Sequence, residues 1–325
     1  MTSKQIKWGI IGAGRIATKF ATDLNTVSNA ELYGIASRHI EKAEDFKGKY
    51  QAKKAYGSYD DMVSDPNIDA VYVATPNSFH KVHTLLCLNH GKSVLCEKPF
   101  AMNLEEVEEM IAASKDKQTL LMEAMWTIFL PHYRYVLDLL QKKHFGAVIK
   151  LEADFGFHPP YNESSRVFDK SVGGGSLLDI GIYPVFAALS TLGKPSSIEA
   201  NAEFFPTGAD SKCDIIFHYD TAKAFLKSTF LEETDTEALF QCETGTIKIH
   251  GRFHEPSSVE LIDQHGNSEL KTFDSKTIGY SYEIEHFNQL IRDGKTESEV
   301  MSFEKSKNLM ATLDDIRSKI GLAYK

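Results

Sequence analysis

The chain of 325 residues lacks the sequence patterns of a metal protein, a disulfide-bonded protein or a membrane protein. Its 4 cysteines and 12 histidines form no CxxC pair, no Cys/His zinc spacing and no HExxH pattern. No run reaches the ~18 apolar residues of a membrane span, and the apolar stretch Trp8–Ile11 is shorter than the ~7 to 15 residue core of a signal peptide. We therefore expect a cytoplasmic protein with reduced thiols and no metal ion.

Positive charge is scarce as well, because 36 Lys and Arg stand against 45 Asp and Glu, giving a formal net charge of -9. A chain with this charge repels polyanions, so we expect neither nucleic acid nor an anionic membrane as its main partner. Any anion that it binds needs a local site. The length favours two domains, and the 42% hydrophobic and 25% charged residues are typical of a globular protein.

The N-terminal part of the sequence alternates short apolar runs with helical patterns. This alternation is typical of a parallel sheet covered by helices. The expected strands are Ile6–Ile11, Leu32–Ala36, Ala70–Thr75, Ser93–Cys96 and Thr119–Met122. We predict a doubly wound α/β domain, the Rossmann arrangement, at residues 1–122.

After Glu123 the pattern changes to apolar residues with a period of two, which predicts a mostly antiparallel sheet. The expected strands include Val148–Phe155, Ile198–Phe204, Ile215–Tyr219 and Thr246–His250, and helical patterns follow at Tyr282–Arg292 and Phe303–Ile320. We predict an α+β domain with a large open sheet at residues 123–325. Because no helices obviously cover this sheet, we expect one of its faces to be buried in a homodimer.

A glycine-rich turn follows the first expected strand and precedes helical sequence, at GAGRIA from 12 to 17. Glycines here permit a tight turn and close backbone approach to a pyrophosphate, while a small residue at 17 lets the helix pack on the strand. The helix N-terminus adds free N–H groups and a positive dipole. We expect dinucleotide contacts from Gly12, Gly14, Arg15, Ile16 and Ala17.

The end of the second strand bears on the choice between NAD and NADP. NAD sites usually place a carboxylate there, about 20 residues beyond the glycines, to bind the ribose 2′-OH. This chain has Ser37 and Arg38 instead, and a hydroxyl beside a guanidinium can bind a phosphate. We expect the protein to prefer NADP as its cofactor. The alternative is that Arg38 is a solvated surface charge and that the protein accepts either NADP or NAD.

The carboxyl ends of the next two strands carry the segments 75–77 (TPN), with His80 beyond it, and 97–99 (EKP). Together with the glycine turn they resemble the Gfo/Idh/MocA family of oxidoreductases. The segments 123–126 (EAMW) and 174–183 (GGSLLDIGIY) resemble the branch with dimeric dihydrodiol dehydrogenases and NADP-linked D-xylose dehydrogenases.

The resemblance implies a site at the carboxyl ends of these strands. It implies cofactor contacts from Thr75, Pro76, Asn77, His80, Glu97 and Lys98. It also implies that Lys98 meets the substrate beside the nicotinamide and that the Lys98–Pro99 bond is cis. The implied substrate is an aldose or a vicinal diol, and the implied assembly is a homodimer through the open sheet.

Many members of the family carry Asp and, four residues later, His; this chain has Asp179 and Tyr183. Spacing of four places both on one helix face. A tyrosine with an ordinary pKa near ~10 needs a nearby cation to act as a base, and Lys98 is the candidate. Asp179 would orient substrate hydroxyls or relay a proton. The alternative is a helix cap and a core aromatic.

Aromatic and basic residues beyond the boundary are candidates for the wall of the substrate pocket, because ring faces pack on the C–H faces of sugars. They are Trp126, Phe155, Phe157, Arg166 and Phe168, and each of the aromatics could equally belong to the core.

Two other functions remain open at this point. A cofactor-bound sensor or structural protein could keep the fold without turnover, because a fold alone does not prove activity. A glycosidase with tightly bound NAD also occurs in the wider family. Turnover of free NADP distinguishes these functions from a dehydrogenase.

Overall fold

A computed structural model describes residues 4–275 and 277–324 and forms two compact units. The first unit comprises the chain up to Trp126 together with the segment that ends at Lys307. The second runs from Thr127 to Ser275 and resumes at Asn308. Sequence analysis placed the boundary at 122 and assigned everything after it to the second domain, whereas the first unit also takes up the segment before Lys307. The outermost residues of both expected domains, 1–3 and 325, lie outside the described residues.

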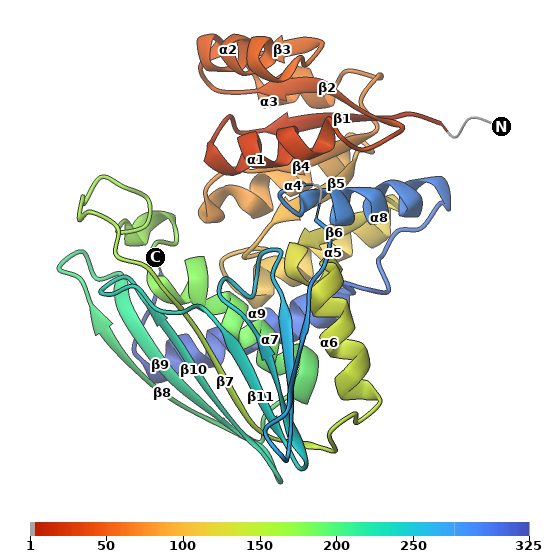
Figure 1. The fold of residues 1–325 in the computed structure, drawn as a ribbon. Helices are drawn as coiled ribbons and strands as arrows, with labels where there is room; N and C mark the ends of the chain where they lie inside the picture. Colours follow the sequence, from red (N-terminus) through yellow and green to blue (C-terminus); the bar gives the residue numbers. More distant parts are fainter. Residues whose placement is uncertain (1–3, 276, 325) are drawn as a thin grey trace. The chain divides into compact units, whose positions relative to one another are not determined.

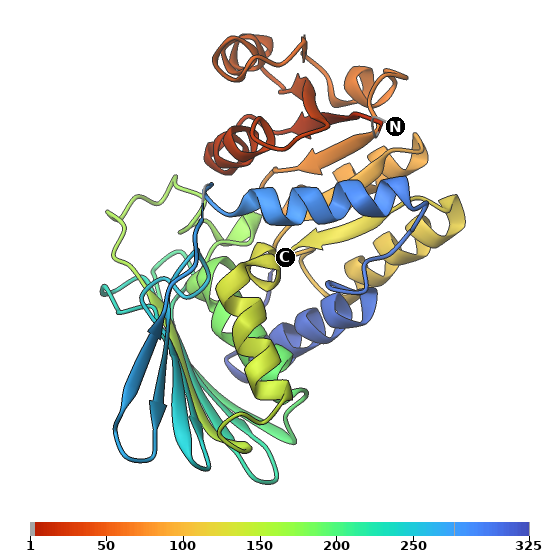
Figure 2. The same cartoon turned by 45° about the vertical axis from the view of Figure 1, so that its right-hand side comes forward.

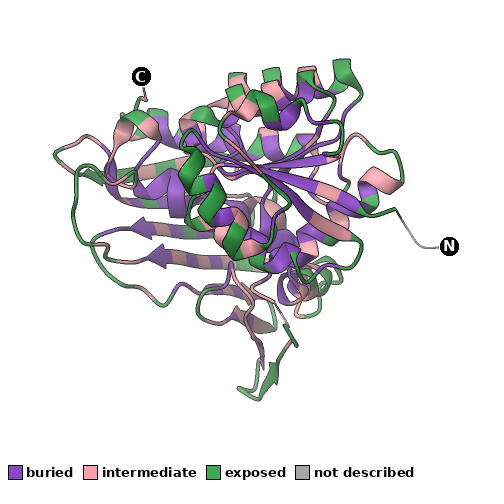
Figure 3. Ribbon diagram, turned by 90° about the horizontal axis from the view of Figure 1, so that it is seen from above, coloured by how far each residue is buried: buried purple, intermediate pink, exposed green. Residues whose placement is uncertain are grey.

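The first unit is built on a parallel sheet with strand order β3-β2-β1-β4-β5-β6. Its strands are β1 Ile6–Ile11, β2 Ala30–Ala36, β3 Lys54–Tyr56, β4 Ala70–Val73, β5 Ser93–Glu97 and β6 Leu121–Ala124. Seen from above, the buried strands lie between layers of helices (Figure 3). Strands buried on both faces read as continuous apolar runs, which is why the sequence revealed them. The predicted α/β fold class is confirmed.

Helices cover both faces of this sheet. They are α1 Arg15–Leu24, α2 Ile40–Tyr50, α3 Tyr59–Val63, α4 His80–Asn89, α5 Leu104–Lys117 and α8 Tyr280–Arg292. Helix α1 contacts α2 and α8, while α4 contacts α3 and α5. Asp23 in α1 accepts hydrogen bonds from the backbone N–H groups of Ile278, Gly279 and Ser281, so a buried carboxylate caps the start of α8.

The second unit contains an eight-stranded sheet with the order β14-β13-β12-β11-β7-β10-β9-β8. Its strands are β7 Val148–Gly156, β8 Ser197–Phe204, β9 Asp210–His218, β10 Lys223–Thr229, β11 Ala238–Cys242, β12 Gly245–Ile249, β13 Val259–Asp263 and β14 Ser268–Lys271. Among the described strands of this sheet, β7 and β10 are the one pair that runs parallel. The predicted large, mostly antiparallel sheet is therefore confirmed (Figure 1).

One face of this sheet is covered within the unit, which corrects the expectation that covering helices are missing. Helix α7 (Ile182–Leu192) packs on β7 and β10, and α6 (Pro131–Gln141) contacts α7 (Figure 2). The last helix, α9 (Phe303–Lys319), passes from the first unit into the second.

The opposite face of the sheet carries Phe225, which is 38% exposed, and polar side chains that contact one another in pairs. Lys212 lies 2.9 Å from Asp214, Lys248 lies 2.7 Å from Glu237, and the pairs Lys150–Glu152, His218–Glu199 and His250–Glu260 extend the pattern. The period-2 pattern thus reflects one apolar face against helices and one mostly polar face on which Phe225 is exposed.

The segment Lys170–Leu192 is long and apolar enough, by composition, to cross a membrane, although polar residues interrupt its apolar sequence. Within the second unit 83% of its apolar window is buried. It holds a 3-10 turn at Lys170–Val172, a π-helix at Leu177–Gly181 and α7. Burial of this degree is that of a core helix.

Candidate active site

The glycine turn between β1 and α1 has the geometry of a dinucleotide site. Gly12 has φ of +99°, and a Cβ there would lie 2.7 Å from the carbonyl oxygen of Ala74, so only glycine fits. Gly14 precedes α1 in extended conformation, no side chain caps that helix end, and nothing lies within 4 Å of the position of a Cβ on Gly14. The first turn of α1 is therefore open to an anion.

The remaining expected contact residues of the turn differ in how far they are buried. Arg15 is exposed, Ile16 is half-buried and Ala17 is fully buried. The N–H of Gly12 donates to the carbonyl of Ala36 at the end of β2, which brings the glycine turn beside the segment that follows β2.

That segment holds Ser37 and Arg38. Ser37 is buried, and its hydroxyl oxygen accepts a hydrogen bond from the N–H of His39 at 3.3 Å. Arg38 lies beside Tyr59 at the start of α3 and beside His83 on α4. Burial raises the pKa of Tyr59 while the Arg38 guanidinium opposes the rise; burial and Arg38 together lower the pKa of His83 to about 4. Sequence analysis did not identify Tyr59 or His83.

His83 connects this corner to the end of β4. Its Nδ1 lies 3.0 Å from the hydroxyl oxygen of Thr75, and its ring stacks on Phe79 and meets Tyr59 edge-on. Pro76 precedes a short 3-10 turn that begins with the buried Asn77. The expected residues after β2 and after β4 thus lie around one polar corner of the first unit.

His80 joins the loops that follow β4 and β5. Its two ring nitrogens lie 2.8 Å from the carbonyl oxygens of Thr75 and Pro99. Burial lowers the pKa of the ring to about 4, against the two backbone contacts, which raise it. His80 therefore contacts the protein backbone and positions the segment that carries Lys98.

Lys98 begins that segment, and the expected cis bond between Lys98 and Pro99 is present. The backbone N–H of Lys98 donates to Glu97 Oε2 at 3.1 Å, and the buried hydroxyl of Tyr72 donates to the other oxygen of Glu97. The contacts described for Glu97 are thus made inside the protein. The N–H of Phe100 donates to Glu123 Oε1 at 3.1 Å, which holds the far end of the turn.

Trp126 belongs to the first unit, where its ring stacks on Tyr280 with centroids 4.4 Å apart. It is 3% exposed. The other residues that sequence analysis proposed for substrate contact lie in the second unit.

In the second unit Asp179 and Arg166 form an ion pair, with Arg166 Nη1 3.0 Å from Asp179 Oδ1. Asp179 lies in the π-helix Leu177–Gly181 and Tyr183 in the first turn of α7, so the predicted helix is present with a wider first turn. Residues four apart remain on one face of such a turn. The alternative that Asp179 caps a helix does not fit, because it lies inside the turn.

The buried Asp210 on β9 holds the start of this π-helix. Its Oδ2 accepts hydrogen bonds from the N–H of Leu177 at 2.7 Å and the hydroxyl of Ser176 at 2.8 Å. Gly175 has φ of +126°, and a Cβ there would collide with the Asp210 carboxylate. The absence of a side chain at Gly175 therefore makes room for a protein carboxylate.

Tyr183 is 7% exposed, and its ring packs on that of His254, which in turn stacks on Phe155. The centroid of the Tyr183 ring lies 5.9 Å from that of Phe155 and 4.5 Å from that of His254. The Arg252 guanidinium lies 5.8 Å from the Phe155 ring. Sequence analysis missed Arg252 and His254, because nothing in their spacing links a loop near residue 252 to a helix near residue 183.

The neighbouring aromatics Phe157 and Phe168 form a cluster. The ring of Phe157 lies 5.1 Å from that of Phe230, and Phe168, which is 1% exposed, lies 4.9 Å from Phe205. Burial of this degree makes Phe168 a core residue.

The described residues contain no group of three or more His, Cys, Asp or Glu side chains that could hold a metal ion, and the 4 cysteines are buried free thiols. What the two units offer is an open helix N-terminus, a lysine at a strand end, and a tyrosine beside a carboxylate–guanidinium pair. These groups can bind a dinucleotide, orient hydroxyl groups and move a proton.

Comparison with known protein families shows which family the chain belongs to. Residues 6–125 match the model of the oxidoreductase family with an NAD-binding Rossmann fold, and residues 133–248 match the GFO/IDH/MocA C-terminal domain. The chain belongs to the Gfo/Idh/MocA family of oxidoreductases. The resemblance noted in the sequence is confirmed.

Relatives in this family match along the full chain. The trans-1,2-dihydrobenzene-1,2-diol dehydrogenase of Xenopus laevis is 36% identical over 98% of this chain and 99% of its own length. The NADP-dependent scyllo-inositol 2-dehydrogenase IolU of Bacillus subtilis is 34% identical over 98% of each chain. The 3-ketoreductase KijD10 of Actinomadura kijaniata, solved with NADP and TDP-benzene, has a TM-score of 0.87, with 25% identity over 98% of each chain.

Proposed function

We propose that this protein is an NADP-dependent dehydrogenase that oxidises, or in reverse forms, a hydroxyl-bearing carbon of an aldose or a vicinal diol. The observation that carries the proposal is the Asp179–Arg166 pair one helical turn before Tyr183. A carboxylate and a guanidinium side by side can accept from and donate to neighbouring hydroxyls of one substrate. The dehydrogenases from Xenopus laevis and Bacillus subtilis, named for diol and inositol substrates, support this class.

The residues of the first unit fit a bound dinucleotide. Gly12 and Gly14 give the backbone close approach, the N-terminus of α1 receives the pyrophosphate, and Arg38 with Ser37 receives a 2′-phosphate. When bound, NADP supplies the carbon that accepts or gives hydride. Thr75, Asn77 and His80 would line the carboxyl end of β4 beside it.

Proton transfer is assigned to three residues of this chain. In oxidation, Tyr183 removes the proton of the substrate hydroxyl as the C–H bond gives up hydride. Lys98 is assigned the positive charge that stabilises the negative charge developing on the substrate oxygen. Asp179 orients the substrate through its second hydroxyl, and Phe155 packs on its C–H face.

The test of this function is an initial-rate screen of aldoses and vicinal diols with NADP, read by the absorbance of NADPH. We expect turnover with at least one neutral polyol. Absence of any turnover would favour a cofactor-bound sensor. Cofactor that stays bound through purification without net reduction would favour a glycosidase.

Preference for NADP over NAD is expected to depend on Arg38. Charge-assisted contacts to a phosphate contribute on the order of 1 to 3 kcal/mol, so wild type should prefer NADP by about 5 to 150-fold in kcat/KM. Arg38→Ala should remove that preference, whereas Arg134→Ala, on the exposed side of α6, should keep it. Equal or better efficiency of wild type with NAD would contradict the prediction.

We also propose that the chain is a homodimer through the outward face of the second sheet. Because that face carries the exposed Phe225 together with ion pairs such as Lys248–Glu237, its interface would combine apolar contact with ion pairs that salt weakens. Light scattering at micromolar concentration should return twice the chain mass of 36.4 kDa at low salt. A monomer mass at every salt concentration would count against the dimer.

A further inference from the structure

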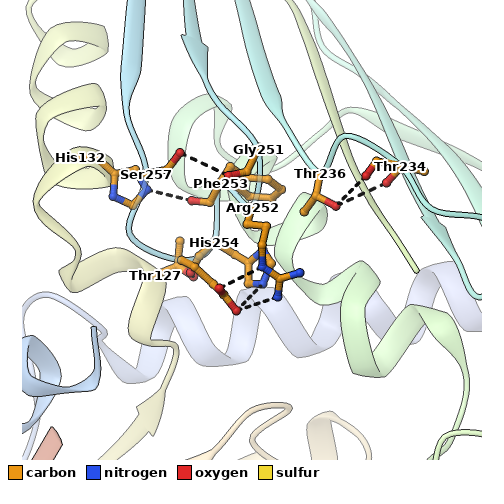
Figure 4. Close-up of polar contacts among 10 residues, drawn as sticks. Thr127, His132, Thr234, Thr236, Gly251, Arg252, Phe253, His254 and Ser257 are labelled. Carbon is orange, nitrogen blue, oxygen red and sulfur yellow. Dashed lines mark hydrogen bonds and ion pairs between the residues drawn. The ribbon is translucent and has the colours of Figure 1, made fainter. Parts of the chain in front are cut away.

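Contacts from distant parts of the chain hold one side of the candidate substrate site in the second unit. The ring of His254, which packs on Tyr183, belongs to the loop between β12 and β13. The hydroxyl of Thr127 donates to the carbonyl of His254 at 3.0 Å (Figure 4). The ring of His132 lies 2.9 Å from the carbonyl oxygen of the neighbouring Phe253. The backbone of this loop is therefore held in place beside Tyr183.

The Arg166–Asp179 ion pair depends on a glycine turn. The segment 157–176 before the π-helix is mostly irregular, and Arg166 lies within it. The N–H of Gly175 donates to the carbonyl of Val167 at 3.0 Å, and its own carbonyl accepts from the N–H of Asp179 at 3.3 Å. One residue of the turn thus bonds both to the backbone next to Arg166 and to that of Asp179. The turn therefore sets the two paired side chains relative to each other.

Gly174, the preceding residue, lies tightly against the backbone that carries Arg166. A Cβ at Gly174 would be 2.4 Å from the carbonyl oxygen of Arg166 and 2.7 Å from that of Asp169, so no side chain fits there. The N–H of Gly174 donates to the carbonyl of Asp169 at 2.9 Å. Because these groups are in direct contact, a bond that holds Gly174 also restrains Arg166.

Tyr324, the last described residue, supplies such a bond. Its hydroxyl donates to the carbonyl of Gly174 at 3.1 Å, and the guanidinium of Arg317 lies 5.1 Å from the centroid of its ring. Burial and the negative charges of Asp210 and Asp179 raise the pKa of Tyr324 above its ordinary value of 10.0, although Arg317 opposes the rise. The hydroxyl therefore keeps the proton that it donates.

The end of helix α9 directs Tyr324 toward the turn. Gly321 has φ of +69°, the conformation that ends many helices. The N–H of Leu322 donates to the carbonyl of Arg317 at 2.9 Å, and the N–H of Gly321 donates to that of Ser318 at 3.3 Å. These two bonds form a Schellman motif, and the 5% exposed Leu322 buries the chain just beyond it. The motif fixes the direction in which the chain leaves the helix, so Tyr324 reaches a glycine that lies 150 residues earlier.

We propose that Tyr324 is a positioning residue for substrate binding, because its hydrogen bond to Gly174 holds the turn that keeps Arg166 against Asp179. The inference rests on the proposed function, in which this ion pair binds substrate hydroxyls. Loss of the bond should loosen the ion pair and weaken its hold on the substrate. Binding of the cofactor, which the proposed function assigns to the first unit, should be spared.

The first test compares Michaelis constants in Tyr324→Phe, which deletes the hydroxyl and keeps the ring beside Arg317. The KM for the best substrate from the screen should rise about fivefold, the loss expected for one hydrogen bond. The kcat and the KM for NADP should stay within about twofold of wild type. The matched control is Tyr219→Phe, which removes a hydroxyl that donates to the carbonyl of Gly193, also at 3.1 Å, and should change none of these constants.

Two results would overturn the proposal. An unchanged KM for the substrate would mean that the bond does not act on the ion pair. Equal losses in kcat and in the KM values of substrate and NADP, with a lower melting temperature, would mean that Tyr324 only supports the fold.

The second test needs no turnover and follows amide hydrogen exchange by mass spectrometry. In Tyr324→Phe, peptides that cover residues 166–179 should exchange about fivefold faster, because the Gly175 and Asp179 amides open more easily. Peptides from β9 and β10 should keep their wild-type rates, and Tyr219→Phe should leave the rates of residues 166–179 unchanged. Unchanged exchange in this segment of Tyr324→Phe, or equally faster exchange throughout the second unit, would contradict the inference.

The two tests separate this inference from the proposed function. If the screen finds no substrate but exchange at residues 166–179 is faster in Tyr324→Phe, the proposed function fails and Tyr324 still holds the turn. If turnover is present while neither the KM for substrate nor the exchange changes, only the inference about Tyr324 fails.

Discussion

Replacing Tyr183 with phenylalanine should reduce turnover by about 100 to 10,000-fold while NADP binding stays nearly intact. Hydride transfer from a carbinol carbon leaves a proton on the substrate oxygen, and a base must remove it. The substitution deletes the titrating hydroxyl and keeps the ring, so the packing against Phe155 and His254 is preserved. Fluorescence titration of NADPH measures binding, and initial rates at saturating substrate measure turnover.

Lys98→Met should be comparably damaging, and the double variant should be little worse than either single one, because groups that act as a unit are non-additive. Tyr219→Phe serves as the matched control, since the hydroxyl of Tyr219 donates to the carbonyl of Gly193 away from these residues. If Tyr183→Phe retained more than about a tenth of wild-type turnover where chemistry limits the rate, the base would be Asp179 or Lys98.

Local pattern predicted most of the fold. Strand β1 begins and ends at the residues that sequence analysis expected, Ile6 and Ile11, because a strand buried on both faces is a continuous apolar run. Strand β3, Lys54–Tyr56, was missed because three residues carry no periodicity. The helical pattern at Tyr282–Arg292 was visible, yet nothing local indicates that this helix returns to the first sheet.

The residues of the candidate site likewise fall into two groups, those that a local motif reveals and those that only the folded structure reveals. Gly12, Lys98 and Tyr183 were identified because motifs concentrate their signal in short segments. Tyr59, His83, Arg252 and His254 reach the site through contacts between segments far apart in the chain, and a single sequence does not record such contacts. The mostly polar outward face of the second sheet was likewise hidden, because a period of two shows that one face is apolar but not which partner covers it.

The second large effect that we expect is on the pH dependence of the free energy of unfolding, and it arises from buried carboxyl groups in the first unit. Burial raises the pKa of Glu123 from its ordinary value of 4.5 to about 7, with the negative charge of Glu97 adding to the rise. Glu283 is fully buried, neither of its oxygens has a hydrogen-bond partner among the described residues, and burial holds its pKa well above 4.5. Both groups bind protons more tightly in the folded chain than in the unfolded one.

The sign of the pH dependence follows from linkage. As the pH rises above 4.5 the unfolded chain releases these protons first, so the free energy of unfolding falls until the folded pKa is passed. For Glu123 the interval from 4.5 to about 7, at about 1.4 kcal/mol per pH unit, corresponds to a loss of about 3 kcal/mol by neutral pH, an upper limit. Glutamine cannot ionise, and its carbonyl can still accept from the Phe100 N–H.

Glu123→Gln should therefore match wild type near pH 4.5 and gain up to about 3 kcal/mol of unfolding free energy by pH 8, measured by denaturant unfolding across this range. Glu283→Gln should also gain free energy of unfolding relative to wild type as the pH rises. Its gain should continue at pH values where that of Glu123→Gln no longer grows, because the pKa of Glu283 is raised further. Glu108→Gln, at an exposed position of α5, should show no such dependence. A gain independent of pH would mean that removal of a buried unpaired oxygen, and not ionisation, is what stabilises the variants.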